Sequence, residues 1–408
     1  MPWKTNDEVG ARQRFIAERL RRNDGVSMVA LCRRHAISRE CGYKWWRRFQ
    51  AEGSKGLTDQ PRLPGSALRL RERWWERLGV AQRQCPDFGP KKLRWKLQGD
   101  YPHQRAPAVI TLARWLERAG AVRRRKRRAP SGPMVTLPGR LQGCRINDVW
   151  TVDLKGSFCT RDGRRVNALT VRDLASRYVL CVRHVGRGGE RQIRPAMCAL
   201  FRRYGLPRAL RMDNGGPFGS LGPRGWARLS TTWVKLGLRL EYGRPGCPQD
   251  NAAHEQMHRM LKERTAQPAA VNPRAQQRRF DRWRQRYNHA RPHESLQMRV
   301  PAARYRSSPR PLPERVPPWR YPSHWQQLWP DSKGRCCWAG RQRLIGRAFA
   351  HEPLGGKLLS PDTLAVYFGP HLLGSLHAHD LAGLRPVQWR TESKREGLRP
   401  SQHPPRSS

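Results

Sequence analysis

The sequence predicts a multidomain protein with an all-α N-terminal region, a central α/β domain on a mixed five-stranded sheet, and a small C-terminal β-barrel. Three observations predict this architecture. Apolar residues recur at helical spacing as far as Gly120, the alternation that is typical of strands begins at Asn147, and short alternating runs return after the proline-rich segment 306–318. The 408 residues are enough for two to four domains with their own cores.

The first predicted unit covers residues 1–58 and is helical. Helical patterns span 7–22, 28–35 and 39–50, and a tight turn at 37–38 separates the last two. Two helices joined by a tight turn, the second basic and aromatic, are typical of a helix-turn-helix motif. The cations of the last helix that we expect to contact DNA are Arg39, Lys44, Arg47 and Arg48. A three-helix bundle without DNA binding fits the same periodicity.

A second helical unit with a basic linker is predicted for residues 66–130. Its helices are expected at 91–97 and 108–119, which indicates a second helix-turn-helix with Arg114 on its polar, DNA-facing side. Six consecutive cations follow at 123–128. Such a run is usually a solvated linker, and here we expect a linker that also contacts phosphates.

The central domain is predicted for residues 139–305. Strands are expected at 149–154, 166–173, 178–185, 209–212 and 238–242, and helices at 191–204, 226–236, 252–265 and 275–289. This order joins an antiparallel meander to parallel additions. It places Asp153 within the first strand and Asp213 at the end of the fourth.

The C-terminal part of the chain has short alternating runs that flank Gly369 and Pro370. Residues 319–389 are therefore expected to form the small β-barrel, and the polar tail 390–408 is expected to be disordered.

The charge balance points to nucleic acid as a partner. The chain has 81 Lys and Arg against 31 Asp and Glu, a formal net charge of +50. A field of this sign and size attracts phosphate backbones. A high-arginine composition that only solvates the surface explains part of the excess, but not its concentration in particular segments.

The ten cysteines contain no C-x-x-C pair, which excludes a zinc ribbon and suits a reducing cytosol. The N-terminus has no apolar run like a signal peptide, and no stretch approaches the ~18 apolar residues of a membrane span. We therefore expect a soluble cytoplasmic protein without a membrane partner.

The helix that begins at Ala252 carries the residues on which the functional interpretation depends. At ~100° per residue, one arc holds Ala253, Met257, Met260 and Leu261, and the opposite, exposed arc holds Glu255, His258, Arg259 and Lys262. Residues 254–258 form the pattern H-E-x-x-H. In zinc metallopeptidases the two histidines of this pattern bind the metal and its glutamate is the general base, which is one interpretation of this segment. Alternatively, Glu255 completes a carboxylate triad with Asp153 and Asp213.

Four segments resemble the insertion-sequence transposases that have a retroviral-integrase-like catalytic core of the ribonuclease H fold. They are 150–156 (WTVDLKG), 211–218 (RMDNGGPF), 245–255 (PGCPQDNAAHE) and 287–296 (YNHARPHESL). They cover about the middle 160 residues, and the flanking helix-turn-helix units and C-terminal barrel fit the same type of protein. Four such motifs in this order are a specific signal.

The resemblance implies that Asp153, Asp213 and Glu255 are the catalytic triad and hold two Mg²⁺ or Mn²⁺ ions per active site. It implies a bacterial, nucleoid-associated transposase that cleaves element ends and transfers strands into target double-stranded DNA. A homo-oligomer, dimer or larger on DNA, is implied because two ends must be joined. Arg259 and Lys262, beside Glu255, would grip phosphates, although an ordinary solvated helix face is an equal alternative for each.

Departures from the family pattern occur at Met212, Leu174, Ala252 and Gln256, none of which is a predicted metal ligand. Two other interpretations stay open. A transposase that has lost catalysis would act as a DNA-binding regulator. A zinc metallopeptidase would use H-E-x-x-H, but the glycine that usually follows the second histidine by three residues is Leu261 here.

Overall fold

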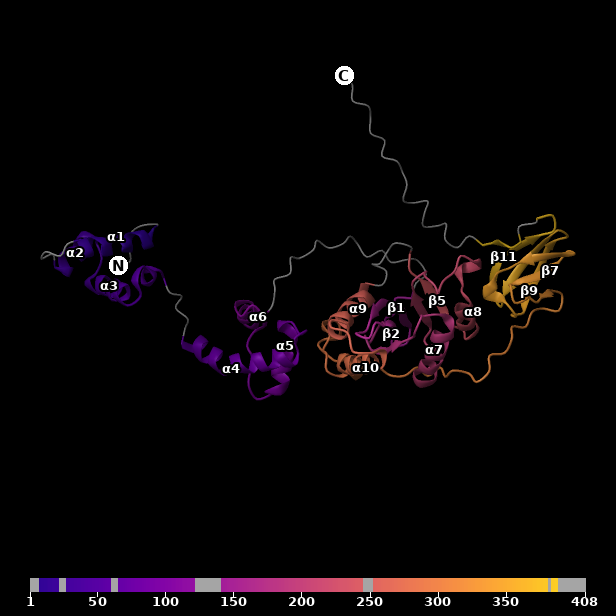
Figure 1. Cartoon of the computed structure of the whole chain (residues 1–408), viewed down its shortest axis with the longest axis horizontal. Helices are drawn as coiled ribbons and strands as arrows, with labels where there is room; N and C mark the ends of the chain where they lie inside the picture. Colours follow the sequence, from indigo (N-terminus) through magenta and orange to yellow (C-terminus); the bar gives the residue numbers. More distant parts are fainter. Residues whose placement is uncertain are drawn as a thin grey trace, which may run out of the picture. The chain divides into compact units, whose positions relative to one another are not determined.

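The computed structural model describes residues 7–21, 27–59, 65–121, 141–244, 252–380 and 383–387 (Figure 1). The chain divides into two compact units, Met1–Ala121 and Val122–Ser408, and each is described by itself. The basic run 123–128, the segment 245–251 of the third family motif and the tail 390–408 lie outside the described residues.

The predicted helical N-terminal region is confirmed. Its first part contains α1 (Glu8–Arg21), α2 (Met28–Arg34), α3 (Arg39–Glu52) and the 3₁₀ turn η1 (Gly53–Leu57). The hydroxyls of Ser27 and Ser38 cap α2 and α3 by accepting hydrogen bonds from backbone amides three residues later. Phe15, Leu31 and Trp45 form the small core between these helices.

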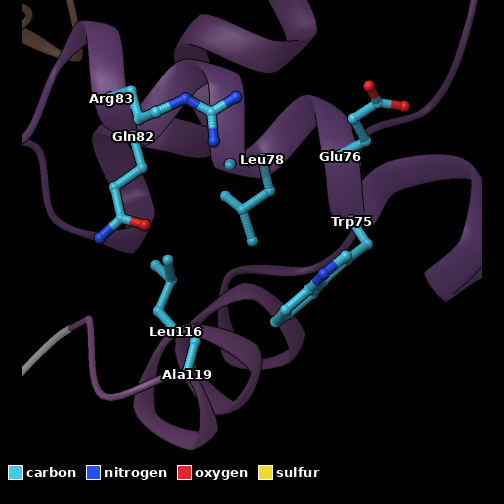
Figure 2. Close-up of a pocket in the computed structure, with 8 residues that line it drawn as sticks. Trp75, Glu76, Leu78, Gln82, Arg83, Leu116 and Ala119 are labelled. Atoms are coloured by element: carbon cyan, nitrogen blue, oxygen red, sulfur yellow. The ribbon is translucent and has the colours of Figure 1, made fainter.

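The second helical part has its own core, formed by α4 (Gly65–Gln84), α5 (Pro90–Asp100) and α6 (Val109–Arg118). The sequence analysis predicted α5 and α6 but did not identify the twenty-residue α4. A pocket of about 360 Å³ lies between α4 and α6, and Figure 2 shows Trp75, Leu78 and Leu116 on its walls.

The central domain is built on a mixed five-stranded sheet, as predicted. Its strands are β1 (Val149–Cys159), β2 (Arg165–Asp173), β3 (Val179–His184), β4 (Ala209–Met212) and β5 (Arg239–Tyr242). They lie in the order β3-β2-β1-β4-β5. The first three strands pair antiparallel, and β4 and β5 are added parallel to β1.

Helices cover both faces of this sheet (Figure 1). On one face α7 (Glu190–Tyr204) and α8 (Arg228–Lys235) pack on a core that includes Trp150, Val152 and Met212. On the other face α9 (Ala252–Thr265) and α10 (Pro273–His289) pack on the alternate side chains of β2 and β3. Three short elements complete the domain: η2 (Pro223–Gly225), η4 (Glu294–Leu296) and α11 (Pro301–Arg304).

The predicted C-terminal barrel is wrong. The strands there are β6 (Gln326–Leu328), β7 (Arg335–Trp338), β8 (Arg341–Leu344), β9 (Leu354–Ser360), β10 (Thr363–Phe368), β11 (His371–His377) and β12 (Arg385–Pro386). Five form an antiparallel sheet in the order β12-β11-β10-β9-β6, and β7 and β8 form a separate hairpin. Within the described residues the two edge strands do not pair with each other, so the sheet stays open.

The C-terminal sheet stays open because other elements cover its apolar face. Its buried cluster combines Leu364 and Phe368 of the sheet, Trp338 of the hairpin, and Trp226 and Val234 of the central domain. The hairpin and the central domain bury the apolar face that a closed barrel would bury in its interior.

The C-terminal sheet docks on the segment between β4 and α8 and on α8 itself. Thr231 Oγ1 donates to the carbonyl of Ala348 at 3.1 Å, and Lys235 Nζ lies 2.8 Å from Glu352 Oε2. Helix α8 therefore supplies part of the docking surface. None of the helices in the described parts of the chain has the length and apolar character of a membrane span.

Candidate active site

Of the first two predicted triad residues, Asp153 lies on β1 and Asp213 directly follows β4, the parallel neighbour of β1. The last paired residues are Thr151 of β1 and Arg211 of β4, and each precedes one of the two aspartates by two residues. Side chains alternate between faces along a strand, so Asp153 belongs to the face of β1 that carries Thr151. Val152 and Met212, which directly precede the two aspartates, belong to the core on the opposite face of the sheet.

Helix α9 lies against this same face through a polar seam. His254 is fully buried, with Nδ1 2.7 Å from Thr151 Oγ1 and Nε2 2.7 Å from Thr170 Oγ1. The Thr170 hydroxyl also lies 2.7 Å from His258 Nε2 and donates to the carbonyl oxygen of Asp153 at 3.0 Å. These contacts connect α9 to β1 and β2 next to Asp153.

Burial in the seam favours the neutral form of His254. Burial, followed by the nearby His258 and Arg172, lowers the pKa of His254 well below its ordinary value. A neutral imidazole has one donor and one acceptor nitrogen, and each of them has a threonine hydroxyl at hydrogen-bond distance. This ring is therefore a structural connector between the helix and the two strands.

The helical-wheel prediction for His258 is wrong. It assigned His258 to the exposed arc with Glu255, whereas the residue is only 6% exposed. The buried arc of α9 includes His254, Met257, His258 and Leu261, because the strands beneath the helix present hydroxyl groups that satisfy both imidazoles.

One group of three potential metal-ligating side chains occurs in the described part of the chain, and it consists of Asp153, His254 and His258. One ligand atom from each lies within 4.8 Å of the others, and His258 Nδ1 is 3.5 Å from Asp153 Oδ2. Glu255 is exposed at the start of α9 and is not in this group, and neither is Asp213.

Asp213 follows the last residue of β4 and is exposed as a whole residue. Partial burial of the carboxylate raises its pKa, and the backbone amide of Gly215 opposes this by hydrogen bonding to the charged form. A Cβ at Gly215 would lie 3.2 Å from Asp213 Oδ2, so the turn after β4 approaches the carboxylate closely.

The predicted DNA-contacting cations are on helix surfaces. Six of the seven are exposed and Arg48 is half-buried, and the seven are Arg39, Lys44, Arg47, Arg48, Arg114, Arg259 and Lys262. Lys44 Nζ and the Arg48 guanidinium each lie 5.0 Å from the ring centre of Trp45, which packs their side chains against the helix.

The roles of Thr151 and Thr170 in the seam, and the structural role of the motif 287–296, were not expected from the sequence. Thr151 precedes Asp153 by two residues, and that period-two spacing is the signal that places a hydroxyl on the same face. In the last motif the buried side chain of Asn288 accepts from the amide of Val179 at 2.8 Å and donates to its carbonyl at 2.9 Å. The buried carboxylate of Asp173 accepts hydrogen bonds from the backbone amides of Asn147 and Ser176.

Family models match two parts of the chain. An integrase core domain matches residues 236–301, and a helix-turn-helix domain matches residues 12–65.

Among solved structures, similar chains include one of the simian T-cell lymphotropic virus intasome, with 14% identity, a TM-score of 0.35, and coverage of 71% of this chain and 98% of that one. The catalytic core domain of BIV integrase has 19% identity and a TM-score of 0.30, and the match covers 39% of this chain and 93% of that one.

Two insertion-element proteins are similar in sequence. The IS407 31.7 kDa protein of Burkholderia multivorans is 30% identical over 231 residues, which are 54% of this chain and 77% of that protein. The IS476 39.2 kDa protein of Xanthomonas euvesicatoria is 29% identical over 223 residues, which are 53% of this chain and 60% of that protein. Together with the integrase core and helix-turn-helix matches, these similarities show that the chain belongs to the insertion-element transposases with an integrase-like core.

Proposed function

We propose that this transposase binds the ends of a mobile DNA element, cleaves them, and joins the released strands to target DNA, with Asp153, Asp213 and Glu255 as its catalytic carboxylates. The observation that supports the proposal is the β1–β4 register, in which Thr151 and Arg211, each two residues before one of the aspartates, lie opposite each other. Glu255 is in the first turn of α9, the helix that packs on the face of β1 that carries Thr151.

The donor set fits a divalent cation. Aspartate and glutamate oxygens are ligands that suit Mg²⁺ and Mn²⁺, and we propose that the triad would hold two such ions. When bound, they would supply activation of a water or a 3′-hydroxyl and stabilisation of the leaving oxygen in phosphoryl transfer. The side chains of the triad orient the reacting groups, and the seam beneath α9 keeps Asp153 and Glu255 on neighbouring elements.

The helical unit 1–58 is proposed to recognise element ends through α3, with Arg39 and Lys44 towards the bases and Arg47 and Arg48 towards the phosphates. Arg114, Arg259 and Lys262 would add phosphate contacts. Because two ends must be brought together, we propose a dimer or larger assembly on double-stranded DNA. The net charge of +50 supports an extended contact with the phosphate backbone.

A strand-transfer assay tests this function. Labelled DNA that carries candidate element ends is incubated with target DNA and Mg²⁺ or Mn²⁺, and the wild type is compared with Asp213→Asn. Joined products are expected only with metal and only from the wild type. Asp281→Asn, an exposed position on α10, is the matched control and should join DNA normally.

Two outcomes would contradict the proposal. Joining by Asp213→Asn at the wild-type rate would remove Asp213 from the catalytic set. DNA binding without cleavage or joining by the wild type would instead identify a DNA-binding regulator.

A further inference from the structure

We propose that Ser230 of α8 and Tyr242 of β5 are positioning residues for Asp213, because their hydroxyl groups hold the turn that carries its carboxylate. The inference rests on the proposed function of Asp213, and it adds two residues that lie outside the four family motifs. Both residues act through the backbone of Phe218 and not on the reacting atoms.

The first step is the contact that the two hydroxyls share. Ser230 Oγ lies 2.5 Å and Tyr242 Oη 3.0 Å from the carbonyl oxygen of Phe218, and the two hydroxyl oxygens are 2.9 Å apart. The hydroxyls have two hydrogens between them and the carbonyl has two lone pairs, so the carbonyl accepts from one or from both. Ser230 is fully buried and Phe218 is 1% exposed, so water has little access to this carbonyl.

The second step is the path from this carbonyl to the carboxylate. The backbone amides of Phe218 and Gly219 donate to the carbonyl of Gly215, at 3.1 and 3.0 Å. The Gly215 amide in turn donates to the Asp213 carboxylate. A Cβ on Gly219 would lie 2.5 Å from the backbone oxygen of Asn214, so the turn is tightly closed. A displacement of Phe218 therefore displaces the amide that holds the carboxylate.

The end of β5 holds the same turn at a second point. The amide of Gly243 donates to the carbonyl of Met212 at 2.9 Å, and the carbonyl of Gly243 accepts from the side-chain amide of Asn214. The residues on both sides of Asp213 are thereby bonded to the residue that follows Tyr242. Strand β5 and helix α8 therefore hold the turn both beside Asp213 and at its far end.

Packing and hydrogen bonding have separate roles at Phe218. Its ring stacks on Trp233 of α8, with ring centres 6.1 Å apart and an interplanar angle of 28°. This contact keeps the side chain in the core, whereas the two hydroxyls set the direction of the carbonyl. A buried carbonyl that loses its donors is expected to turn towards other donors, and the turn would move with it.

The test compares Ser230→Ala, Tyr242→Phe and the double variant with the wild-type chain. Phenylalanine keeps the ring of Tyr242, and alanine removes one oxygen atom from Ser230, so most of the packing stays. Each single variant leaves one hydroxyl at the Phe218 carbonyl, and only the double variant removes both. The fold-loss in the double variant should therefore exceed the product of the two single fold-losses.

The first readout is the single-turnover rate constant of strand transfer, with protein in excess over labelled element-end DNA and with Mg²⁺ or Mn²⁺. The double variant should join DNA about 10–100-fold more slowly, as is usual when groups that orient a metal ligand are removed. Its DNA affinity, measured by fluorescence anisotropy, should not change. Partial unfolding would lower the fraction of DNA that is joined, whereas a displaced carboxylate lowers the rate constant.

The second readout needs neither metal nor DNA. Hydrogen exchange in the peptide that contains the amides of Phe218 and Gly219 should be faster in the double variant, while peptides from α4 to α6 should not change. Thr232→Val is the matched control, because Thr232 lies on the same helix and its hydroxyl donates to the carbonyl of Arg228 at 3.3 Å, within that helix. This variant should match the wild type in both readouts.

Two results would overturn the inference: a wild-type rate constant in the double variant, or wild-type exchange in its turn peptide. The proposed function is tested separately by Asp213→Asn. Joining by Asp213→Asn at the wild-type rate would reject the triad. If Asp213→Asn does not join DNA but the double variant joins it normally, the triad stands and only the positioning roles of Ser230 and Tyr242 are rejected.

Discussion

Replacing Thr170 by valine tests the polar seam beneath α9. Valine has nearly the same shape as threonine, and the residue is fully buried, so the change removes a hydroxyl without creating a cavity. In the wild type this hydroxyl donates to the carbonyl of Asp153 and lies 2.7 Å from the Nε2 atoms of two buried imidazoles, those of His254 and His258. The variant should therefore lose stability through unsatisfied polar groups alone.

The size of the loss follows from the number of groups left without a partner. If both imidazole N–H groups lose their acceptor, the cost is about 2–6 kcal/mol, at about 1–3 kcal/mol for each. His254 can reduce this cost by moving its proton to Nδ1 and donating to Thr151, which lies 2.7 Å away. Only His258 is then unsatisfied, so about 1–3 kcal/mol is the lower expectation. Thr170→Ser keeps the hydroxyl and should cost about 1 kcal/mol for the lost methyl group.

Hydrogen exchange read by mass spectrometry is the appropriate assay, because a chain with several cores does not unfold in one step. Peptides from β1, β2 and α9 should exchange about 5–150-fold faster in Thr170→Val, which corresponds to about 1–3 kcal/mol. Peptides from α4 to α6 serve as an internal reference and should not change. Unchanged protection in Thr170→Val would refute the assignment of this hydroxyl as the shared hydrogen-bond partner of the two imidazoles.

Three further predictions concern other parts of the chain. Because the pKa of His254 is lowered in the folded state, the unfolded chain binds an additional proton below pH ~6.5. The stability of the folded state should therefore fall as the pH drops through this value. In His254→Gln this fall, measured by hydrogen exchange in β1, should be shallower. Arg47→Ala should weaken binding to element ends at every sequence and reduce the salt dependence by about one ion, measured by fluorescence anisotropy. Asn288→Leu should cost about 2–4 kcal/mol, because it removes both hydrogen bonds to the buried backbone of Val179, and exchange in β3 reports it.

The main elements of the central domain follow from local sequence patterns. Apolar alternation identified the five strands, and the motif around Asp213 marked the end of β4. The position of His258 could not be predicted in this way. A helical wheel treats histidine as polar and exposed, whereas Thr151 and Thr170, which satisfy the imidazoles, are separated from α9 by about 100 and 80 residues.

The C-terminal sheet shows a similar limit. Alternating residues in 364–368 and 371–376 indicate strands, but they do not reveal whether the two edges meet. That outcome depends on Trp226 and Val234, which belong to a different part of the chain and occupy the space over the sheet. The long helix α4 was missed because charged residues interrupt its apolar pattern, and its burial depends on contacts with α5 and α6.

The shared cluster around Trp226 affects how the protein can be divided for expression. The Trp226 ring is 5% exposed and contacts Phe349, Phe368 and His371, all of which come after residue 305. A fragment that ends at 305 would leave this indole and its neighbour Val234 without their apolar cover. Such a catalytic fragment would be prone to self-association, and one that runs on through β11 would keep the cover that the native chain provides.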